Sequence, residues 1–370
     1  MLSNISVGGI LLCGVAVCGF GEVLPEVGKL RLGEQSWTVR QGAPREIYQR
    51  EDLKALRLYG WPDGTMGVLP EANGQWLFFS ASATPHTVVR TVGSTGEPAG
   101  RVDRSRIRMH GQYNYLAGGP VVEIEGKLYL MAHAERFLGS KQVFHSSLVL
   151  TRALDLGGNE FAELGPVITS AIAEGESKSA VELGAGPMVV HGEHLYVFHR
   201  DRMPDGAEVN LAAARVALDR FGEAIRGGQV PAFEKWFEGE WREAGVGGRS
   251  SPLEPGNPLV RWMDVKFSPR LGLFVAAIAS NRGLGGKKVD LRLIVSRDGL
   301  RWSDTCWLSD VQEELFYPTL VEMPESAGLP GRFLLYHTAS RQGGFKRPEN
   351  MRLVVREVEL RESVPAGGGG

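Results

Sequence analysis

Short apolar runs separated by turn residues dominate this chain, and patterns compatible with a helix occur only around 51–59 and 212–225. Five runs are rich in aromatic and branched side chains, a composition typical of β-strands. These runs are residues 75–79, 127–131, 194–198, 273–277 and 332–336. Each one follows another apolar strand and a tight turn, and a polar loop and a third strand come after it. The pattern therefore predicts a repeated antiparallel unit.

The repeated unit occurs five times along the chain. Its first strands begin at Gly67, Gly119, Gly186, Met263 and Tyr317. Repeats of small antiparallel sheets at periods of roughly 50 to 80 residues are typical of a β-propeller. We therefore predict an all-β, five-bladed β-propeller that forms a single domain over about residues 45–362, with the N-terminal stretch helping to cover or close it. A β-sandwich is the alternative, because short and evenly spaced strands also suit it.

Composition and charge narrow the possible partners. The chain has 370 residues, 43% of them apolar and 23% charged, and its 41 Lys and Arg against 43 Asp and Glu give a net charge of −2. Without a basic surplus to neutralise phosphates, nucleic acid is not an expected partner. The sequence holds no Cys/His pattern of a metal site, so we predict no metal and no cofactor, although a structural divalent cation stays open. We expect a monomer.

The two ends of the chain lie outside the predicted propeller. Residues 5–20 are apolar and small, but too short for a membrane span of about 20 residues. They are typical of a secretory signal, so we predict a leader over 1–22, no membrane span in the mature chain, and export to the periplasm or beyond. A lipid anchor on Cys18 is a weaker possibility because Val17 fits that pattern poorly, and a buried N-terminal strand is another alternative. Residues 363–370 are predicted to be a flexible tail.

Strand direction indicates which polar residues share one end of a propeller. The start of a first strand and the end of the antiparallel second strand lie at the same end of each blade. Residues at the starts of the first strands are Asp63, Tyr115, Glu182, Asp264 and Tyr317, and residues at the ends of the second strands are His133, Glu135, His199, Asp201 and His337. The opposite end carries only short glycine hairpins. We therefore predict the functional site at the first end.

Several segments carry a resemblance to a known superfamily. Residues 186–187 with 196–201, then 247–252 and 317–320, together with an Asp-box-like hairpin at 296–302, resemble the five-bladed propeller glycoside hydrolases. That superfamily includes arabinanases, β-xylosidases and fructan-cleaving enzymes. The resemblance covers about residues 60–360 and implies a secreted glycosidase of carbohydrate metabolism. The usual Arg-Asp-Pro of the first blade is replaced here by Pro62-Asp63-Gly64.

Cleavage of a glycosidic bond needs one carboxylic acid and a second carboxylate that activates water or attacks the sugar. The resemblance places Glu182 near the position of the family's acid and Asp63 near that of its base. We therefore expect Glu182 to be the general acid and Asp63 or Asp264 to be the base or nucleophile. Glu135 and Asp201 are the remaining catalytic candidates. Acids on different blades favour a wide separation and hence inversion.

Aromatic and basic side chains near the same end are candidates for binding the sugar. These substrate-binding candidates are Tyr115, Trp262, Tyr317, His133, His199, His337 and Arg249. Two alternatives stay open, because fold alone does not determine function. One is a carbohydrate-binding propeller without catalysis, and the other is a lyase or isomerase that uses His133 or His199 as its base.

Overall fold

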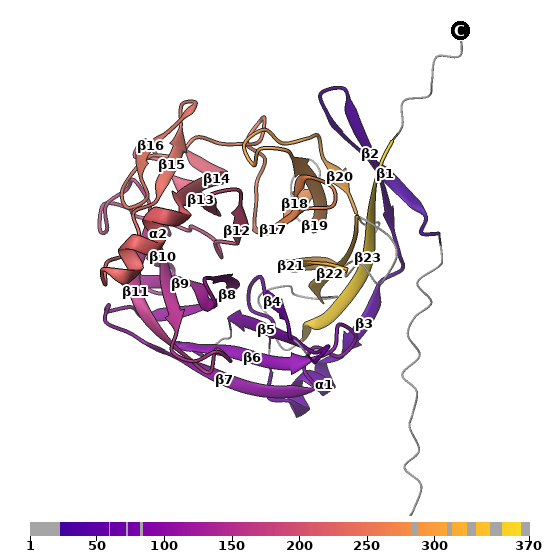
Figure 1. The fold of residues 1–370 in the computed structure, drawn as a ribbon, viewed down its shortest axis with the longest axis horizontal. Helices are drawn as coiled ribbons and strands as arrows, with labels where there is room; N and C mark the ends of the chain where they lie inside the picture. Colours follow the sequence, from indigo (N-terminus) through magenta and orange to yellow (C-terminus); the bar gives the residue numbers. More distant parts are fainter. Residues whose placement is uncertain are drawn as a thin grey trace, which may run out of the picture.

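The computed structural model describes residues 23–363 except 59, 72, 82–83, 283–287, 309–312, 324–330 and 341–349. The predicted leader therefore lies outside the described residues, as does the predicted tail apart from Ser363. Antiparallel sheets surround a central axis as five blades (Figure 1). The prediction of an all-β, five-bladed propeller is confirmed.

Blades 1 and 2 join into one eight-stranded sheet. Blade 1 holds β4 (Gly67–Pro70), β5 (Trp76–Ala81), β6 (Thr87–Gly93) and β7 (Arg101–Arg108), and blade 2 holds β8 (Tyr115–Ile124), β9 (Lys127–Ser140), β10 (Val143–Ala153) and β11 (Glu160–Thr169). The outer strands β7 and β11 pair in parallel, with Arg106 opposite Glu160 and Arg108 opposite Ala162. This pairing fixes the two blades relative to each other.

Blades 3 and 4 form separate sheets. Blade 3 holds β12 (Met188–His191), β13 (His194–Arg202), β14 (Glu208–Ala217), β15 (Glu234–Phe237) and β16 (Glu240–Ala244), with α2 (Leu218–Arg226) between β14 and β15, and blade 4 holds β17 (Trp262–Ser268), β18 (Leu273–Arg282), β19 (Lys288–Ser296) and β20 (Cys306–Trp307). The Asp-box turn follows β19, where Asp298 Oδ1 accepts the N–H groups of Leu300 and Arg301. These hydrogen bonds stabilise the turn, so the role of the motif is structural.

Blade 5 is completed by the first described strands of the chain. It contains β21 (Glu314–Glu322), β22 (Arg332–Ser340) and β23 (Arg352–Glu362), followed outward by β2 (Gln35–Gln41) and β1 (Glu26–Leu32), while β3 (Arg45–Tyr48) pairs with the start of β23 and leads to α1 (Arg50–Ala55). The buried side chains of Leu30, Trp37 and Val39 pack into the core of blades 4 and 5. The sheets thus begin at Glu26, upstream of the boundary predicted near residue 45.

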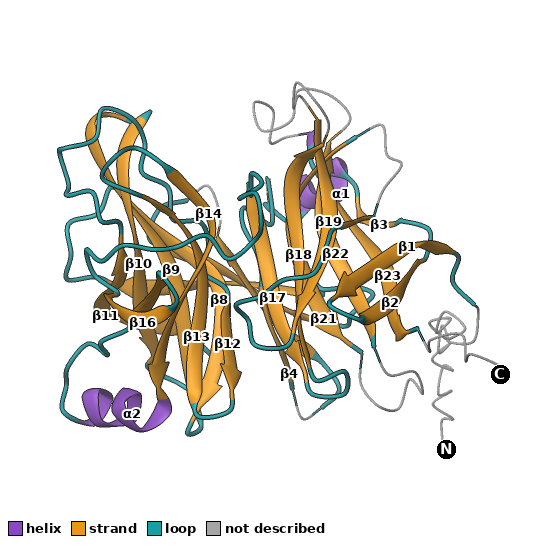
Figure 2. Ribbon diagram, turned by 90° about the horizontal axis from the view of Figure 1, so that it is seen from above, coloured by secondary structure: helices purple, strands orange, loops and turns teal. Residues whose placement is uncertain are grey.

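The two ends of the propeller differ. The β12–β13 turn and α2 lie at one end, and the long β9–β10 hairpin extends at the other (Figure 2). We call the end at which the first strands of the blades begin the mouth. Near the axis the inner strands of blades 1 and 2 approach closely, since a Cβ on Gly67 would lie 2.0 Å from the carbonyl oxygen of Gly119. Only glycine fits such an approach.

Candidate functional site

Six predicted side chains from four blades gather at the mouth. We call them the mouth cluster; they are Asp63 before β4, Tyr115 on β8, His133 and Glu135 on β9, Glu182 before β12 and Tyr317 on β21. Hydrogen bonds and mutual effects on pKa connect all six. Strand direction therefore predicted a group that the fold does bring together.

His133 lies between acceptors on both sides of its ring. Its Nε2 is 3.2 Å from Oε1 of Glu135, and its Nδ1 is 3.0 Å from the carbonyl oxygen of Gly184 and 3.6 Å from Oε1 of Glu182. A ring nitrogen bonds a carbonyl or carboxylate oxygen only as a donor, so both nitrogens carry protons. Burial opposes the charged ring, but the carboxylates of Glu182 and Glu135 raise the pKa of His133 to about 9. The ring is therefore an imidazolium at neutral pH.

The segment before β12 presents Glu182 to the mouth. Ser146 on β10 holds this segment on both sides of Glu182, because its N–H donates to the Val181 carbonyl oxygen and its Oγ accepts the Leu183 N–H. The Gly184 N–H donates to Oε1 of Glu182 at 2.7 Å. Within the described part of the chain, Oε2 of Glu182 forms no hydrogen bond. One carboxylate oxygen is thus anchored and the other is available for a ligand.

Asp63 is held by a tyrosine with an uncommon backbone conformation. The Tyr317 hydroxyl donates to Oδ1 of Asp63 at 2.7 Å. Tyr317 has a φ of 52° at a bulge in β21, and its ring packs 5.0 Å from that of Trp262. A left-handed aromatic residue costs about 1–3 kcal/mol, and such strain often accompanies functional sites. Burial raises the pKa of Asp63, the Tyr317 bond lowers it, and the charge of Glu135 raises it further.

Tyr115 is the member of the mouth cluster that β8 of blade 2 contributes. It lies opposite Glu135 in the β8–β9 pair, and its ring centroid is 6.4 Å from that of His133. Burial and then the charges of Asp63 and Glu135 raise the pKa of its phenol. Burial and Asp63 likewise raise the pKa of Tyr317. Both phenols therefore keep their protons at neutral pH and can donate hydrogen bonds.

Asp201 lies apart from the mouth cluster. Its carboxylate is buried and accepts hydrogen bonds from Lys235 Nζ at 2.7 Å and Ser250 Oγ at 2.6 Å. Lys235 Nζ also donates to the carbonyl oxygens of Thr169 and Gly248, each at 2.7 Å. This network joins strands and a loop of blade 3 to the end of β11 in blade 2. It gives no support to the predicted catalytic role of Asp201.

Asp264 is closed off between blades 4 and 5. Its side chain is fully buried, its Oδ2 accepts the Leu320 N–H at 2.8 Å, and Lys266 Nζ lies 3.4 Å from Oδ1. Burial raises the pKa of this carboxyl group. A substrate at the mouth cannot contact a side chain that is inaccessible to water. Asp63 is therefore the better supported of the two predicted bases.

The remaining basic candidates also lie away from the cluster. His199 and His337 are completely buried, and burial, followed by a nearby cation, lowers the pKa of His199 to about 4 and that of His337 to about 3. His337 Nε2 accepts a hydrogen bond from Arg356. Arg249 is bound to Glu243 and packs over a phenylalanine ring on the outer part of blade 3. Trp262 alone among the other predicted binding residues contacts the cluster, through Tyr317.

Across the described residues, no group of three or more His, Cys, Asp or Glu side chains is arranged to hold a metal ion. The helices in that part of the chain are all too short or too polar to span a bilayer.

Comparison with known proteins identifies the fold. Neither a protein-family profile nor a curated protein sequence matches this chain. Solved structures do match. An α-L-arabinofuranosidase from Podospora anserina aligns over 82% of this chain and 93% of its own, with 13% identity and a TM-score of 0.51. An α-L-arabinofuranosidase from Lactobacillus brevis aligns over 78% and 88%, with 10% identity and a TM-score of 0.49. Bacillus subtilis arabinanase aligns over 80% and 94%, with 10% identity and a TM-score of 0.47. The predicted resemblance to propeller glycoside hydrolases is thus confirmed as a likeness of fold.

Proposed function

We propose that this chain is a glycoside hydrolase whose two catalytic carboxylates are Glu182 and Asp63. The observation that carries the proposal is the meeting of these two groups, from blades 3 and 1, around the same imidazolium and the same phenol. Paired carboxylates at a shared site are what hydrolysis of a glycosidic bond requires. The fold shared with an α-L-arabinofuranosidase supports the same proposal.

We assign the base to Asp63 and the acid to Glu182. The Tyr317 hydrogen bond fixes one oxygen of Asp63, and burial brings its pKa closer to the working pH, as suits a general base. Glu182 has an anchored Oε1, so Oε2 is positioned to protonate a departing sugar oxygen. Because the two groups come from different blades, we expect room for a water molecule and inversion at the anomeric carbon.

The alternative of a histidine base has little support in this geometry. His133 carries both ring protons and is bound on both sides, so it has no lone pair with which to take a proton. His199 and His337 are neutral but completely buried. A non-catalytic binding propeller remains the competing function, and it is the one that the experiment must separate from hydrolysis.

Release of reducing sugar from a panel of glycans tests the proposal. Because the Podospora anserina protein is an α-L-arabinofuranosidase, arabinan, arabinoxylan and aryl arabinofuranosides come first, followed by xylan and fructan. The wild type should hydrolyse at least one, and Asp63→Asn should reduce turnover about 10²-fold or more. Glu123→Gln, an exposed carboxylate change on β8, is the matched control and should retain activity. Binding without hydrolysis across the panel would favour the non-catalytic function.

We also infer that the chain is exported and loses residues 1–22. The inference rests on the apolar segment at 5–20, which has the length and composition of a secretory signal. N-terminal sequencing of the protein from fractions of an expressing bacterium tests it. A mature start close to residue 22 in the exported fraction is expected, whereas an intact N-terminus in the cytoplasmic fraction would contradict export.

A further inference from the structure

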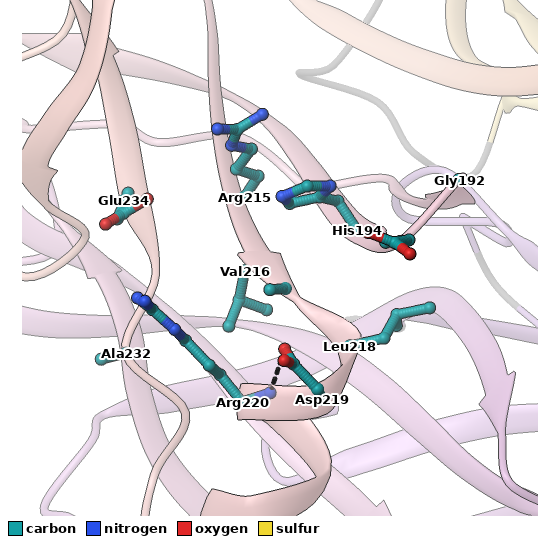
Figure 3. A pocket seen from close by; sticks show the side chains of 11 residues that line it. Gly192, His194, Arg215, Val216, Leu218, Asp219, Arg220, Ala232 and Glu234 are labelled. Carbon is teal, nitrogen blue, oxygen red and sulfur yellow. Dashed lines mark hydrogen bonds between the residues drawn. The ribbon is translucent and has the colours of Figure 1, made fainter.

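A cavity lies at the end of blade 3 opposite to the mouth. It has a volume of about 650 Å³ and is formed by the β12–β13 turn, the end of β14, the first turn of α2 and the start of β15 (Figure 3). Its lining residues with charged or ring side chains are Glu193, His194, Arg215, Asp219, Arg220 and Glu234. A volume of this size falls within the roughly 300–1,000 Å³ of sites for small ligands. We call it the blade 3 pocket.

Most polar side chains of the blade 3 pocket lack a protein partner. Arg215 packs over the Trp241 ring at 4.5 Å, and its buried Nε has no hydrogen-bond partner within the described residues. The side chains of Glu193, His194, Arg220 and Glu234 likewise form no hydrogen bond or ion pair there. Outside the pocket, by contrast, Arg242 on the same blade pairs with Glu238 at 2.6 Å. Glu193 and Arg220 are exposed and hydrated, so the buried Nε of Arg215 is the group that carries the argument. A buried donor without a partner at the edge of a cavity is what a ligand site offers before binding.

The backbone holds these groups on rigid elements. Arg215 on β14 lies directly opposite Glu234 on β15, and His194 at the start of β13 lies opposite Ala217. Figure 3 shows Arg215 and His194 directed toward the same side of the pocket, with Arg220 and Asp219 across from them. Side chains on paired strands keep their spacing when a ligand binds, which lowers the cost of association.

The charge balance indicates which ligand chemistry fits. Two arginines face three carboxylates, so the pocket has no positive surplus that would favour phosphate or another strong anion. Burial and the charge of Arg215 lower the pKa of His194, so its neutral ring offers one donor and one acceptor. Donors and acceptors of both kinds around one cavity suit a neutral ligand with many hydroxyl groups, because each hydroxyl both donates and accepts.

We propose that the blade 3 pocket is a second glycan-binding site, separate from the mouth cluster, that holds neutral sugar units through Arg215, His194 and Glu234. The turn at Gly192 and the segment of Glu182 lie at opposite ends of β12, so an occupant leaves the mouth free. Binding here does not depend on hydrolysis at the mouth. The pocket would keep a polysaccharide chain close to the protein between catalytic events.

Binding stoichiometry and affinity measured by titration calorimetry test this second site. The probes are soluble oligosaccharides from arabinan, xylan and fructan, with inorganic phosphate as the anionic comparison. Arg215→Ala and the milder His194→Gln should each remove one bound oligosaccharide per chain or weaken it at least about tenfold, as loss of a charged or buried hydrogen bond implies. The matched control Arg242→Ala should bind as the wild type does.

Turnover of a small aryl glycoside separates this proposal from the proposed hydrolysis. Arg215→Ala and His194→Gln should keep wild-type kcat/KM on such a substrate and lose only the binding of an oligosaccharide at the blade 3 pocket. If hydrolysis is absent, loss of one oligosaccharide in Arg215→Ala still supports the pocket. Unchanged stoichiometry and affinity in both folded pocket variants, or binding of phosphate in preference to sugars, would overturn it.

Discussion

At the scale of single residues, His133 connects the carboxylates of the mouth cluster. Its pKa rises from 6.5 to about 9 in the folded protein. The stabilisation from its charge is therefore complete below pH 6.5 and is lost as the pH rises through 9. A shift of this size corresponds to at most about 3 kcal/mol.

The prediction for His133 follows from that linkage. His133→Gln should be less stable than the wild type at pH 6, and the difference should shrink by up to about 3 kcal/mol by pH 10. Urea unfolding of both proteins across this range measures the effect. A difference that does not depend on pH would show that the histidine is not charged in the native state.

Tyr317 gives a second prediction at this scale, about the pH dependence of activity. Its hydroxyl lowers the pKa of Asp63, so Tyr317→Phe should raise that pKa and move the acidic limb of kcat/KM to higher pH. Turnover should also fall about tenfold or more, since the lost bond is to a charged group. Tyr336→Phe, which removes a buried hydroxyl bound to a carbonyl oxygen, is the control and should leave the limb in place. If the acidic limb of kcat/KM lies at the same pH in Tyr317→Phe and in the wild type, Asp63 is not the catalytic base.

At the scale of elements, the Asp201–Lys235 pair joins strands of blade 3. Asp201→Asn leaves the Lys235 ammonium buried without a counter-charge, which costs about 3–5 kcal/mol. We expect a large loss of stability but kcat/KM within about threefold of the wild type for the folded fraction. The measurement pairs thermal unfolding with kinetics at low temperature. If Asp201→Asn were stable but had about 10²-fold lower activity, the result would instead indicate a catalytic role for Asp201.

The strands β1 and β2 complete blade 5 and so close the propeller, and this role gives a second prediction at the scale of elements. Trp37→Ala removes a fully buried indole from the core of blades 4 and 5 and should cost about 3–5 kcal/mol. Val27→Ala on the neighbouring strand is the control, because Val27 is exposed and should change stability by no more than about 0.5 kcal/mol. Equal effects of the two substitutions in urea unfolding would contradict the closure.

One physical reason explains which predicted site residues lie together and which lie apart. Strand direction indicates which end of a blade a residue occupies, and Glu135 and Glu182 do lie close together at that end. It carries no information on depth or on which face of the blade a side chain lies. Asp201 and His199 were therefore predicted at the mouth, yet they are buried within the protein. Ser146, which holds the segment of Glu182, had no signal in the sequence because it acts through its backbone and a single hydroxyl.

At the scale of the whole molecule, the five blades and a role of the N-terminal stretch in closing the ring were predictable from the sequence, but the strand pairing of that stretch was not. Residues 26–41 lack the spacing of the repeat, and their partner β23 follows more than 300 residues later. A pairing between such distant segments depends on the shape of the completed ring. The parallel pairing of β7 and β11 could not be predicted from the sequence for the same reason, because it joins the outer strands of two separately predicted blades.

The central claim is that Glu182 protonates the departing sugar oxygen, and Glu182→Gln tests it most directly. The substitution keeps the shape of the side chain and removes the proton. The measurement is kcat/KM of this variant and of the wild type on a natural glycan and on aryl glycosides with progressively better leaving groups. We predict a loss of about 10² or more on the glycan that diminishes as the leaving group improves, because a good leaving group needs no protonation. An equal loss on every substrate, or wild-type activity throughout, would contradict the account.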